Sequence, residues 1–256
     1  MVTPGGAAEA ADSHIVRIDG SRPVSAEAVR ELTALCDRAE DHESPGIVVA
    51  HLTGAPEGSW TEGLTVAVTN KWERVLRRLE RLPITTVAVA SGDCGGTALD
   101  VLLATDYRIA LADARLMMPL QADATWPGMA AYRLAQQAGA AAVRRAVLFG
   151  MPIPAAEALS LHLVDEVAED PDEALARVTA MAGAVSGSEL AIRRRLMLDA
   201  TTTSFEDALG THLAACDRTL RRLAAHVAPV APVAPDAPVA PVAPVAPVAP
   251  IAPVAP

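Results

Sequence analysis

Cysteines are scarce in this chain, basic residues are fewer than acidic ones, and long apolar runs are missing. The three cysteines, Cys36, Cys94 and Cys216, are odd in number and far apart, which favours reduced thiols over a disulfide scaffold. The formal net charge of -10 argues against nucleic acid or an anionic membrane as a partner. No apolar run reaches the ~18 residues of a membrane-spanning helix, and no signal-peptide pattern opens the chain. We therefore expect a cytoplasmic protein.

The apolar residues, 51% of the 256, suffice for one sizeable core. Residues 1–12 are small and polar, and we expect them to be disordered. Residues 13–170 contain both strand and helix patterns, whereas residues 171–226 show helical patterns only. Residues 227–256 repeat the triplet VAP, and proline at every third position excludes helix and sheet there. This division predicts an α/β core, a C-terminal helical region and a polyproline-type tail.

Periodicity places the individual elements of the α/β core. Ser25 is expected to cap the first helix, and Thr69 or Asn70 to cap a second, amphipathic helix with Trp72 on its inward face and a Glu73–Arg77 pair outward. The strands are expected at 14–19, 47–52, 84–90, 116–119 and 163–167, and later helices at 129–139, 141–149, 155–161, 172–185, 189–200 and 205–226. Among these elements the strand at 84–90 opens the stretch with the clearest chemical pattern.

That stretch, Ile84 to Ala110, predicts a buried strand, a glycine turn and an apolar helix. The first backbone N–H groups of such a helix have no partner within it, and the helix dipole favours negative charge beside them. Asp100 lies three positions after Thr97 and so shares a helix face with it. One face can therefore present both an oxyanion donor and a carboxylate. Alternatively, Asp100 only complements the helix dipole.

Two other patterns carry possible chemistry. His51 ends the strand at 47–52, where active-site residues of α/β sheets gather, but no partner for it is visible in the sequence, which favours a local hydrogen-bonding role. Gly92, Cys94 and Gly96 match the G-x-C-x-G form of a nucleophile elbow, with His162 or His212 later in the chain. A thiol near a helix N-terminus has a depressed pKa. The second pattern therefore indicates a Cys94-dependent α/β-hydrolase or thioesterase.

Three segments in order resemble the crotonase (enoyl-CoA hydratase/isomerase) superfamily. They are VAVASGDCGGTALDVLLATDYRIALADARLMMP at Val87–Pro119, WPG at Trp126–Gly128, and FGMPIPAAEALSLHLVDEV at Phe149–Val167. Within the superfamily the chain most resembles the DpgB-type hydratase-like proteins of 3,5-dihydroxyphenylglycine biosynthesis. That narrower likeness is carried by RPVSAEAVRELTALCDRAED, KWERVLRRLERL, SGDCGG, ATWPGMAAYRLAQQAG and ATTTSFEDALGTHLAACDR.

The resemblance implies a crotonase-like spiral of ββα units assembled as a homotrimer or hexamer. It implies an acyl-CoA thioester as substrate, with no further cofactor and no metal. The thioester oxygen would be held by two backbone amides, one of them at Thr97. In this chain the segment that supplies the second amide is contracted to APEGSW, so Gly58, Ser59 or Trp60 would provide it, with Gly58 as the candidate. Gly96, Trp60, Trp126 and Gly128 are the residues expected to bind substrate, since indole rings can stack on an aromatic acyl group.

The acid/base residues depart from the family pattern. Asp100 aligns with the first catalytic glutamate and shortens its reach by one methylene, roughly 1.5 Å. Leu120 aligns with the second glutamate, and Asp123 lies close by but off register. Asp100 is therefore the expected catalytic residue, acting as a single acid and base.

The resemblance predicts dehydration and aromatisation of a polyketide CoA intermediate to 3,5-dihydroxyphenylacetyl-CoA, a step towards glycopeptide antibiotics. The expected partners are a type III polyketide synthase and a second crotonase-family protein. Besides the Cys94 hydrolase, one alternative stays open, namely a non-catalytic crotonase-like protein that binds an intermediate or serves as a scaffold.

Overall fold

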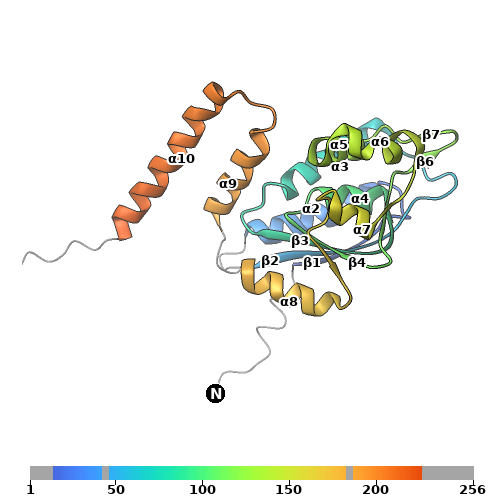
Figure 1. The fold of residues 1–256 in the computed structure, drawn as a ribbon, viewed down its shortest axis with the longest axis horizontal. Coiled ribbons are helices and arrows are strands. Elements are labelled where there is room, and N and C mark those ends of the chain that lie inside the picture. Colours follow the sequence, from blue (N-terminus) through green and yellow to red (C-terminus); the bar gives the residue numbers. More distant parts are fainter. Residues whose placement is uncertain (1–13, 42–45, 183–186, 227–256) are drawn as a thin grey trace, which may run out of the picture. The chain divides into compact units, whose positions relative to one another are not determined.

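The computed structural model describes residues 14–41, 46–182 and 187–226 of the chain. A parallel sheet forms its centre, in the order β1 (Ile15–Asp19), β2 (Ile47–Gly54), β3 (Thr85–Gly95), β4 (Tyr107–Leu111) and β9 (Glu166–Ala168). Helices cover both faces of this sheet (Figure 1). The predicted α/β class is thereby confirmed. The N-terminal segment 1–12, which we expect to be disordered, and the polyproline-type tail 227–256 lie outside the described residues.

Strand β3 is longer than its neighbours, and this length shapes the fold. Its first half pairs with β2 and β4, whereas Asp93–Gly95 pair in parallel with β5 (Arg115–Met117). The sequence predicted that this strand would break at Gly92, but the strand continues to Gly95 because β5 supplies new partners for its backbone. Strand β5 also pairs, antiparallel, with β8 (Ile153–Pro154), so the sheet branches at β3.

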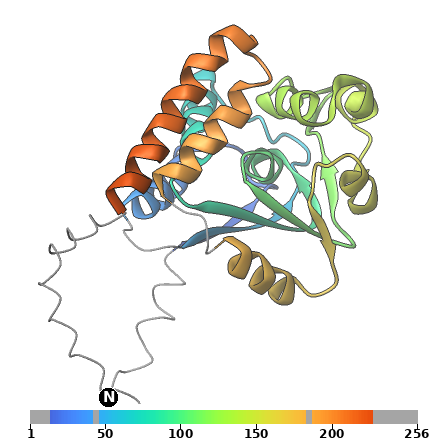
Figure 2. The ribbon, with the colours of Figure 1, turned by 60° about the vertical axis from the view of Figure 1, so that its left-hand side comes forward.

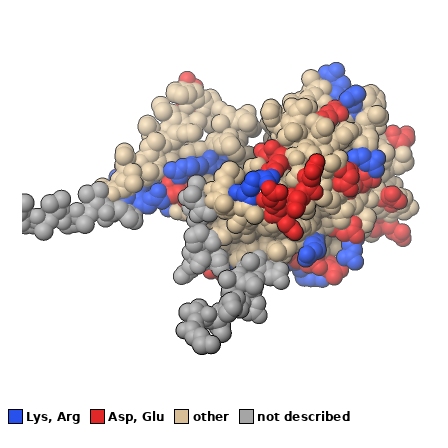
Figure 3. Space-filling model, turned by 60° about the horizontal axis from the view of Figure 1, so that its bottom comes forward, with Lys and Arg blue, Asp and Glu red and all other residues tan. Residues whose placement is uncertain are grey.

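The alternation of side chains along β3 divides the core into two parts. Ala88 and Ala90 face α2 (Ala26–Glu40), α3 (Val66–Leu79) and α4 (Gly96–Leu103), whereas Val87 and Val89 face α8 (Pro171–Ala182). Successive residues of a strand point to opposite faces, and a sheet covered on both faces is apolar on both. Figure 2 shows the helices on either side of the strands. The face bearing α8 carries acidic side chains with arginines interspersed (Figure 3).

The helix caps bear out one prediction and correct another. Ser25 caps α2, and its hydroxyl accepts from the Ala28 N–H at 3.2 Å, as expected. The cap of α3 is Thr65 instead of Thr69 or Asn70, because the Thr65 backbone is extended and its hydroxyl accepts from the Val68 N–H. The amphipathic helix therefore begins one turn earlier than predicted, and Thr69 lies within it.

Two further expectations about this region are wrong. Glu73 does not pair with Arg77; it binds Arg133, while Arg77 binds Glu80. The helix after the glycines ends at Leu103, whereas the sequence predicted helix up to Ala110. Tyr107–Leu111 forms β4 instead, because its backbone pairs with β3 on one side and β9 on the other. Tertiary pairing thus overrides the local helical preference.

The second half of the core is mainly helical. The hairpin β6 (Leu120–Gln121) and β7 (Ala124–Thr125) leads to α5 (Met129–Ala138), α6 (Ala140–Phe149) and α7 (Ala155–Ser160). These helices lie where the sequence placed them, whereas the strand expected at 163–167 begins three residues later, as β9. Helix α5 starts beside the carboxyl end of the sheet, so its first residues help to enclose the site described below.

The C-terminal helices are α9 (Ser188–Asp199), which is shifted by one residue from the predicted range, and α10 (Phe205–His226), which matches its predicted range. The chain divides into two compact units, Met1–Thr211 and His212–Pro256, so α9 belongs to the first unit together with the sheet. The predicted boundary between residues 170 and 171 therefore does not coincide with this division. Within the ranges described, no helix has the length and apolarity needed to cross a membrane.

Candidate active site

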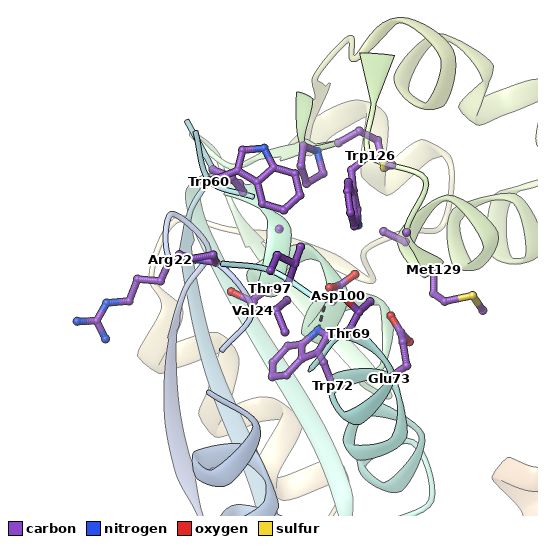
Figure 4. A pocket seen from close by; sticks show the side chains of 18 residues that line it. Arg22, Val24, Trp60, Thr69, Trp72, Glu73, Thr97, Asp100, Trp126 and Met129 are labelled. Carbon is purple, nitrogen blue, oxygen red and sulfur yellow. Dashed lines mark hydrogen bonds between the residues drawn. The ribbon is translucent and has the colours of Figure 1, made fainter. Parts of the chain in front are cut away.

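A cavity lies at the carboxyl ends of β1, β2 and β3, between α3, α4 and the start of α5 (Figure 4). Five separate segments line it: Arg22–Val24 after β1; Pro56, Trp60 and Leu64 after β2; Thr69, Trp72 and Glu73 of α3; Gly96, Thr97 and Asp100 of α4; and Met118, Pro119, Trp126 and Gly128–Ala130. Carboxyl ends of parallel strands are where ligands bind in α/β folds. The cavity is therefore the candidate site.

The amino end of α4 forms one wall of this cavity. Gly95 is its N-cap and makes no side-chain hydrogen bond to the helix, so the first backbone N–H groups keep their capacity to bind a ligand. Gly96 has φ of +51°, and a Cβ there would lie 2.6 Å from the Pro56 side chain and 2.9 Å from the Gly20 carbonyl oxygen. Glycine is thus required for the sharp entry that presents the Thr97 backbone to the cavity.

Asp100 lies one turn further along α4, and its carboxylate faces the same cavity. The Trp72 indole N–H donates to Oδ2 of Asp100 at 2.9 Å. Burial raises the pKa of Asp100 to about 7; the hydrogen bond from Trp72 opposes this, the charge of Glu73 adds to it, and the charge of Arg133 opposes it. Asp100 can therefore exchange a proton near neutral pH, as a general acid or base requires.

Trp72 is a functional residue that sequence reasoning assigned only to the core. It is 1% exposed, in agreement with the predicted inward face of α3. Its indole N–H, however, is the donor that orients Asp100, which is 28 positions away in the chain. A buried tryptophan usually donates its indole N–H to an acceptor. That general rule is the only sequence-level sign that Trp72 would have a polar partner.

Two tryptophans form the wall opposite Asp100, as Figure 4 shows. The rings of Trp60 and Trp126 meet edge to face, with centroids 5.2 Å apart and an interplanar angle of 78°. The Trp60 indole N–H donates to the Leu120 carbonyl oxygen at 2.8 Å, which fixes its ring. Gly128 caps α5 next to Trp126, and a Cβ there would lie 2.7 Å from that indole ring. The cavity thus combines one apolar aromatic wall with one polar wall.

The structure brings together six of the seven predicted site residues: Gly96, Thr97, Asp100, Trp60, Trp126 and Gly128. Gly58 is exposed and does not line the cavity, whereas Pro56 and Trp60, two positions away on either side, do. Leu120 is 49% exposed on β6, and Asp123 is exposed in the hairpin turn, so neither faces Asp100 across the cavity. His51 lines a separate depression on the surface.

The Cys94 hydrolase hypothesis is wrong. Cys94 lies within β3, paired with Gly54 and Leu116, and its side chain is fully buried. Burial raises the pKa of its thiol to about 12, so the nucleophilic thiolate is disfavoured. A nucleophile elbow holds its nucleophile in a strained turn. Cys94 has no such backbone, since Ala122 and His162 are the non-glycine residues of positive φ in the described part of the chain.

Comparison with known proteins agrees with this geometry. The family model for enoyl-CoA hydratase/isomerase matches residues 15–226. A protein of Amycolatopsis orientalis named enoyl-CoA-hydratase is 57% identical over 210 residues, which cover 82% of this chain and 97% of that protein.

Solved structures extend the likeness to the whole fold. An enoyl-CoA hydratase/isomerase from Marinobacter aquaeolei matches with a TM-score of 0.68 at 18% identity, covering 83% of this chain and 87% of that one. An enoyl-CoA hydratase from Thermoplasma volcanium matches with a TM-score of 0.68 at 17% identity, covering 81% and 88%. The family model and the sequence relative establish more than a shared fold: this chain belongs to the enoyl-CoA hydratase/isomerase family.

Proposed function

We propose that this protein binds an acyl-CoA thioester and eliminates water from its acyl group, with Asp100 transferring the proton. The observation that carries the proposal is the position of Asp100. Its carboxylate shares one cavity with the amino end of α4, and its pKa of about 7 suits proton transfer at neutral pH. The elimination is neutral in redox terms, so it requires no cofactor beyond the thioester itself.

The Thr97 amide is proposed to stabilise the charge that develops during this reaction. Removal of a proton next to the thioester carbonyl leaves an enolate, whose negative oxygen would accept hydrogen bonds at the start of α4. One such donor contributes about 2.7–4 kcal/mol to the transition state. Gly58 remains the predicted second donor, and its amide would have to enter the cavity from its present exposed loop.

In the simplest scheme Asp100 alone carries out both proton transfers. Its carboxylate takes the α-proton while the C–H electron pair enters the enolate. The enolate then re-forms the carbonyl while its electron pair forms the carbon–carbon double bond, the bond to the β-hydroxyl breaks, and Asp100 returns the proton so that water leaves. A positioned acid/base group of this kind contributes on the order of 10²–10⁴ in rate.

The proposed acyl group is a polyketide that becomes aromatic on loss of water, giving 3,5-dihydroxyphenylacetyl-CoA. The likeness to DpgB-type proteins suggests this substrate, and the wall formed by the edge-to-face indoles of Trp60 and Trp126 suits a flat, partly unsaturated acyl chain. A type III polyketide synthase would supply the intermediate, and a second crotonase-family protein would assist.

Product analysis by mass spectrometry tests this proposal. Malonyl-CoA and a type III synthase that makes this product would be incubated alone, with the native protein, and with its Asp100→Asn variant. Asp123→Asn is the matched control, because it makes the same change at an exposed position outside the cavity. We expect the native protein and the control to raise the yield of the aromatic thioester, and Asp100→Asn to lose most of that effect.

A different pattern would favour the non-catalytic alternative. If the native protein and Asp100→Asn raise the yield equally, the protein only binds the intermediate or organises the synthase. The feature that favours this non-catalytic alternative is Leu120, which stands at the position of the family's second glutamate and cannot transfer a proton.

A further inference from the structure

A second carboxylate lines the cavity, although not at the position that the family pattern indicates. Glu73 follows Trp72 on α3, and its side chain is 21% exposed. Figure 4 shows Asp100 and Glu73 on the same side of the cavity, away from Trp60 and Trp126. Glu73 and Asp100 belong to two different helices, so their spacing in the sequence does not indicate that they share a cavity.

A buried arginine holds Glu73 in place. Arg133 of α5 is 7% exposed and binds Glu73 at 2.9 Å through Nη2 and Glu80 at 3.1 Å through Nε. Its remaining nitrogen, Nη1, is buried without a hydrogen-bond partner in the described structure. An arginine guanidinium stays charged at all working pH values, so Glu73 meets the cavity as one half of an ion pair.

The two carboxylates therefore have contrasting surroundings. Asp100 is half-buried and accepts a hydrogen bond from a neutral indole, whereas Glu73 is bound directly to a cation. Two carboxyl groups whose surroundings differ in this way, one beside a neutral donor and one bound to a guanidinium, are suited to different roles in proton transfer. The remaining charged group that lines the cavity is Arg22, on the loop after β1.

We propose that Glu73 is the second catalytic residue, acting as the base that removes the α-proton while Asp100, in its protonated form, donates to the leaving hydroxyl. This inference rests on the function proposed above and divides its two proton transfers between two groups. Arg133 is then a positioning residue, which acts through Glu73.

The step balances without any further reactant. The Glu73 carboxylate gains the α-proton as the C–H bond breaks, and the electron pair forms the enolate. The enolate pair then forms the carbon–carbon double bond, the bond to the β-oxygen breaks, and the proton of Asp100 converts the leaving hydroxyl into water. Transfer of a proton from Glu73 back to Asp100 through solvent restores the starting state.

Hydrogen exchange separates this scheme from the single-residue one, because it reports α-proton removal alone. Phenylacetyl-CoA would be incubated in D₂O with each protein, and deuterium uptake at its α-carbon followed by mass spectrometry. We expect Glu73→Gln to slow exchange by at least about 100-fold, and Asp100→Asn to slow it far less, because Asp100 does not remove the α-proton in this scheme. Glu73→Asp should recover part of the rate, since it keeps the base.

Glu80→Gln is the matched control. Glu80 binds the same guanidinium and loses the same charge in this variant, but it does not line the cavity. We expect it to keep most of the native exchange rate. Thermal unfolding of Glu73→Gln checks that its fold is intact, and Glu73→Asp gives a second test if it is not.

The opposite pattern would overturn the inference: Glu73→Gln exchanging at the native rate while Asp100→Asn does not. The pH profile gives an independent check. If Asp100 acts as an acid, elimination falls as the pH rises through about 7, and if Asp100 is the sole base, elimination rises over the same range. Loss of aromatic product in Asp100→Asn together with native exchange and product in Glu73→Gln would refute the role of Glu73 and leave the proposed function standing.

Discussion

Burial gives Asp100 its chemical usefulness and also makes its ionised form costly in the folded chain. The pKa of its carboxyl rises from an ordinary 3.8 to about 7, chiefly because the protein removes water from around it. Between these two values the folded chain holds a proton that the unfolded chain has released. The free energy of unfolding therefore falls as the pH rises through this window, and the cost is complete above about pH 7.

Asp100→Asn should consequently stabilise the protein while abolishing most turnover. The amide oxygen can still accept from Trp72, and no charge is buried. We expect the gain in unfolding free energy to be on the order of 2 kcal/mol larger near pH 8 than near pH 5.5, as urea denaturation would measure. Asp123→Asn should show no such pH-dependent gain. Equal gains for Asp100→Asn at both pH values would show that its carboxyl is not desolvated.

Among the elements, α9 depends on one buried arginine for its attachment to the sheet. Arg194 is 5% exposed on its side chain and binds the Asp106 carboxylate and the carbonyl oxygens of Leu82 and Ile84. Asp106 in turn accepts from the backbone N–H of Thr86 in β3. A buried ion pair costs desolvation energy but leaves an uncompensated charge when one partner is removed.

Arg194→Met should therefore destabilise the first compact unit by about 3–5 kcal/mol. Arg195→Met is the matched control, because Arg195 is 71% exposed and forms its ion pair with Asp199, one turn away on the same helix. Exposed pairs of this kind contribute about 0.2–1 kcal/mol. Chemical denaturation of both variants measures the difference. Similar losses in the two would mean that the Arg194 network contributes no more than a surface pair.

Considered as a whole molecule, the single chain leaves a row of large apolar side chains exposed along α10. Phe205, Leu209, Leu213, Leu220 and Leu223 recur at the spacing of one helix face and are between 43% and 75% exposed. Contiguous exposed apolar residues often mark an interface between subunits. The homotrimer or hexamer that the family resemblance implies stays a prediction, and this row is where we expect its subunits to meet.

Sedimentation equilibrium should accordingly give the mass of three or six chains. Leu213→Glu places a charge in the middle of the apolar row, and we expect it to lower the assembly number. Thr211→Glu adds the same charge at an exposed residue two positions away, off that row, and should leave the assembly unchanged. A native protein that sediments as a single chain would refute the predicted assembly.

The sequence by itself determined the features that depend on neighbours along the chain. The apolar period predicted most helices and strands, Ser25 was identified as a cap, and Thr97 and Asp100 were placed on one face of one helix turn. The family likewise followed from motifs in order. Such features depend on spacings of one to four residues, and the regular geometry of a helix or strand places residues at these spacings on the same face.

The tertiary structure decided which distant residues act on that turn. Burial between packed segments chiefly sets the protonation of Asp100, and Trp72 and Glu73 of α3 and Arg133 of α5 adjust it. Local sequence also could not distinguish Arg194 from Arg195, one buried on the sheet and the other in water. Desolvation and charge act through space and not along the chain, so they are defined only once separate segments have packed together.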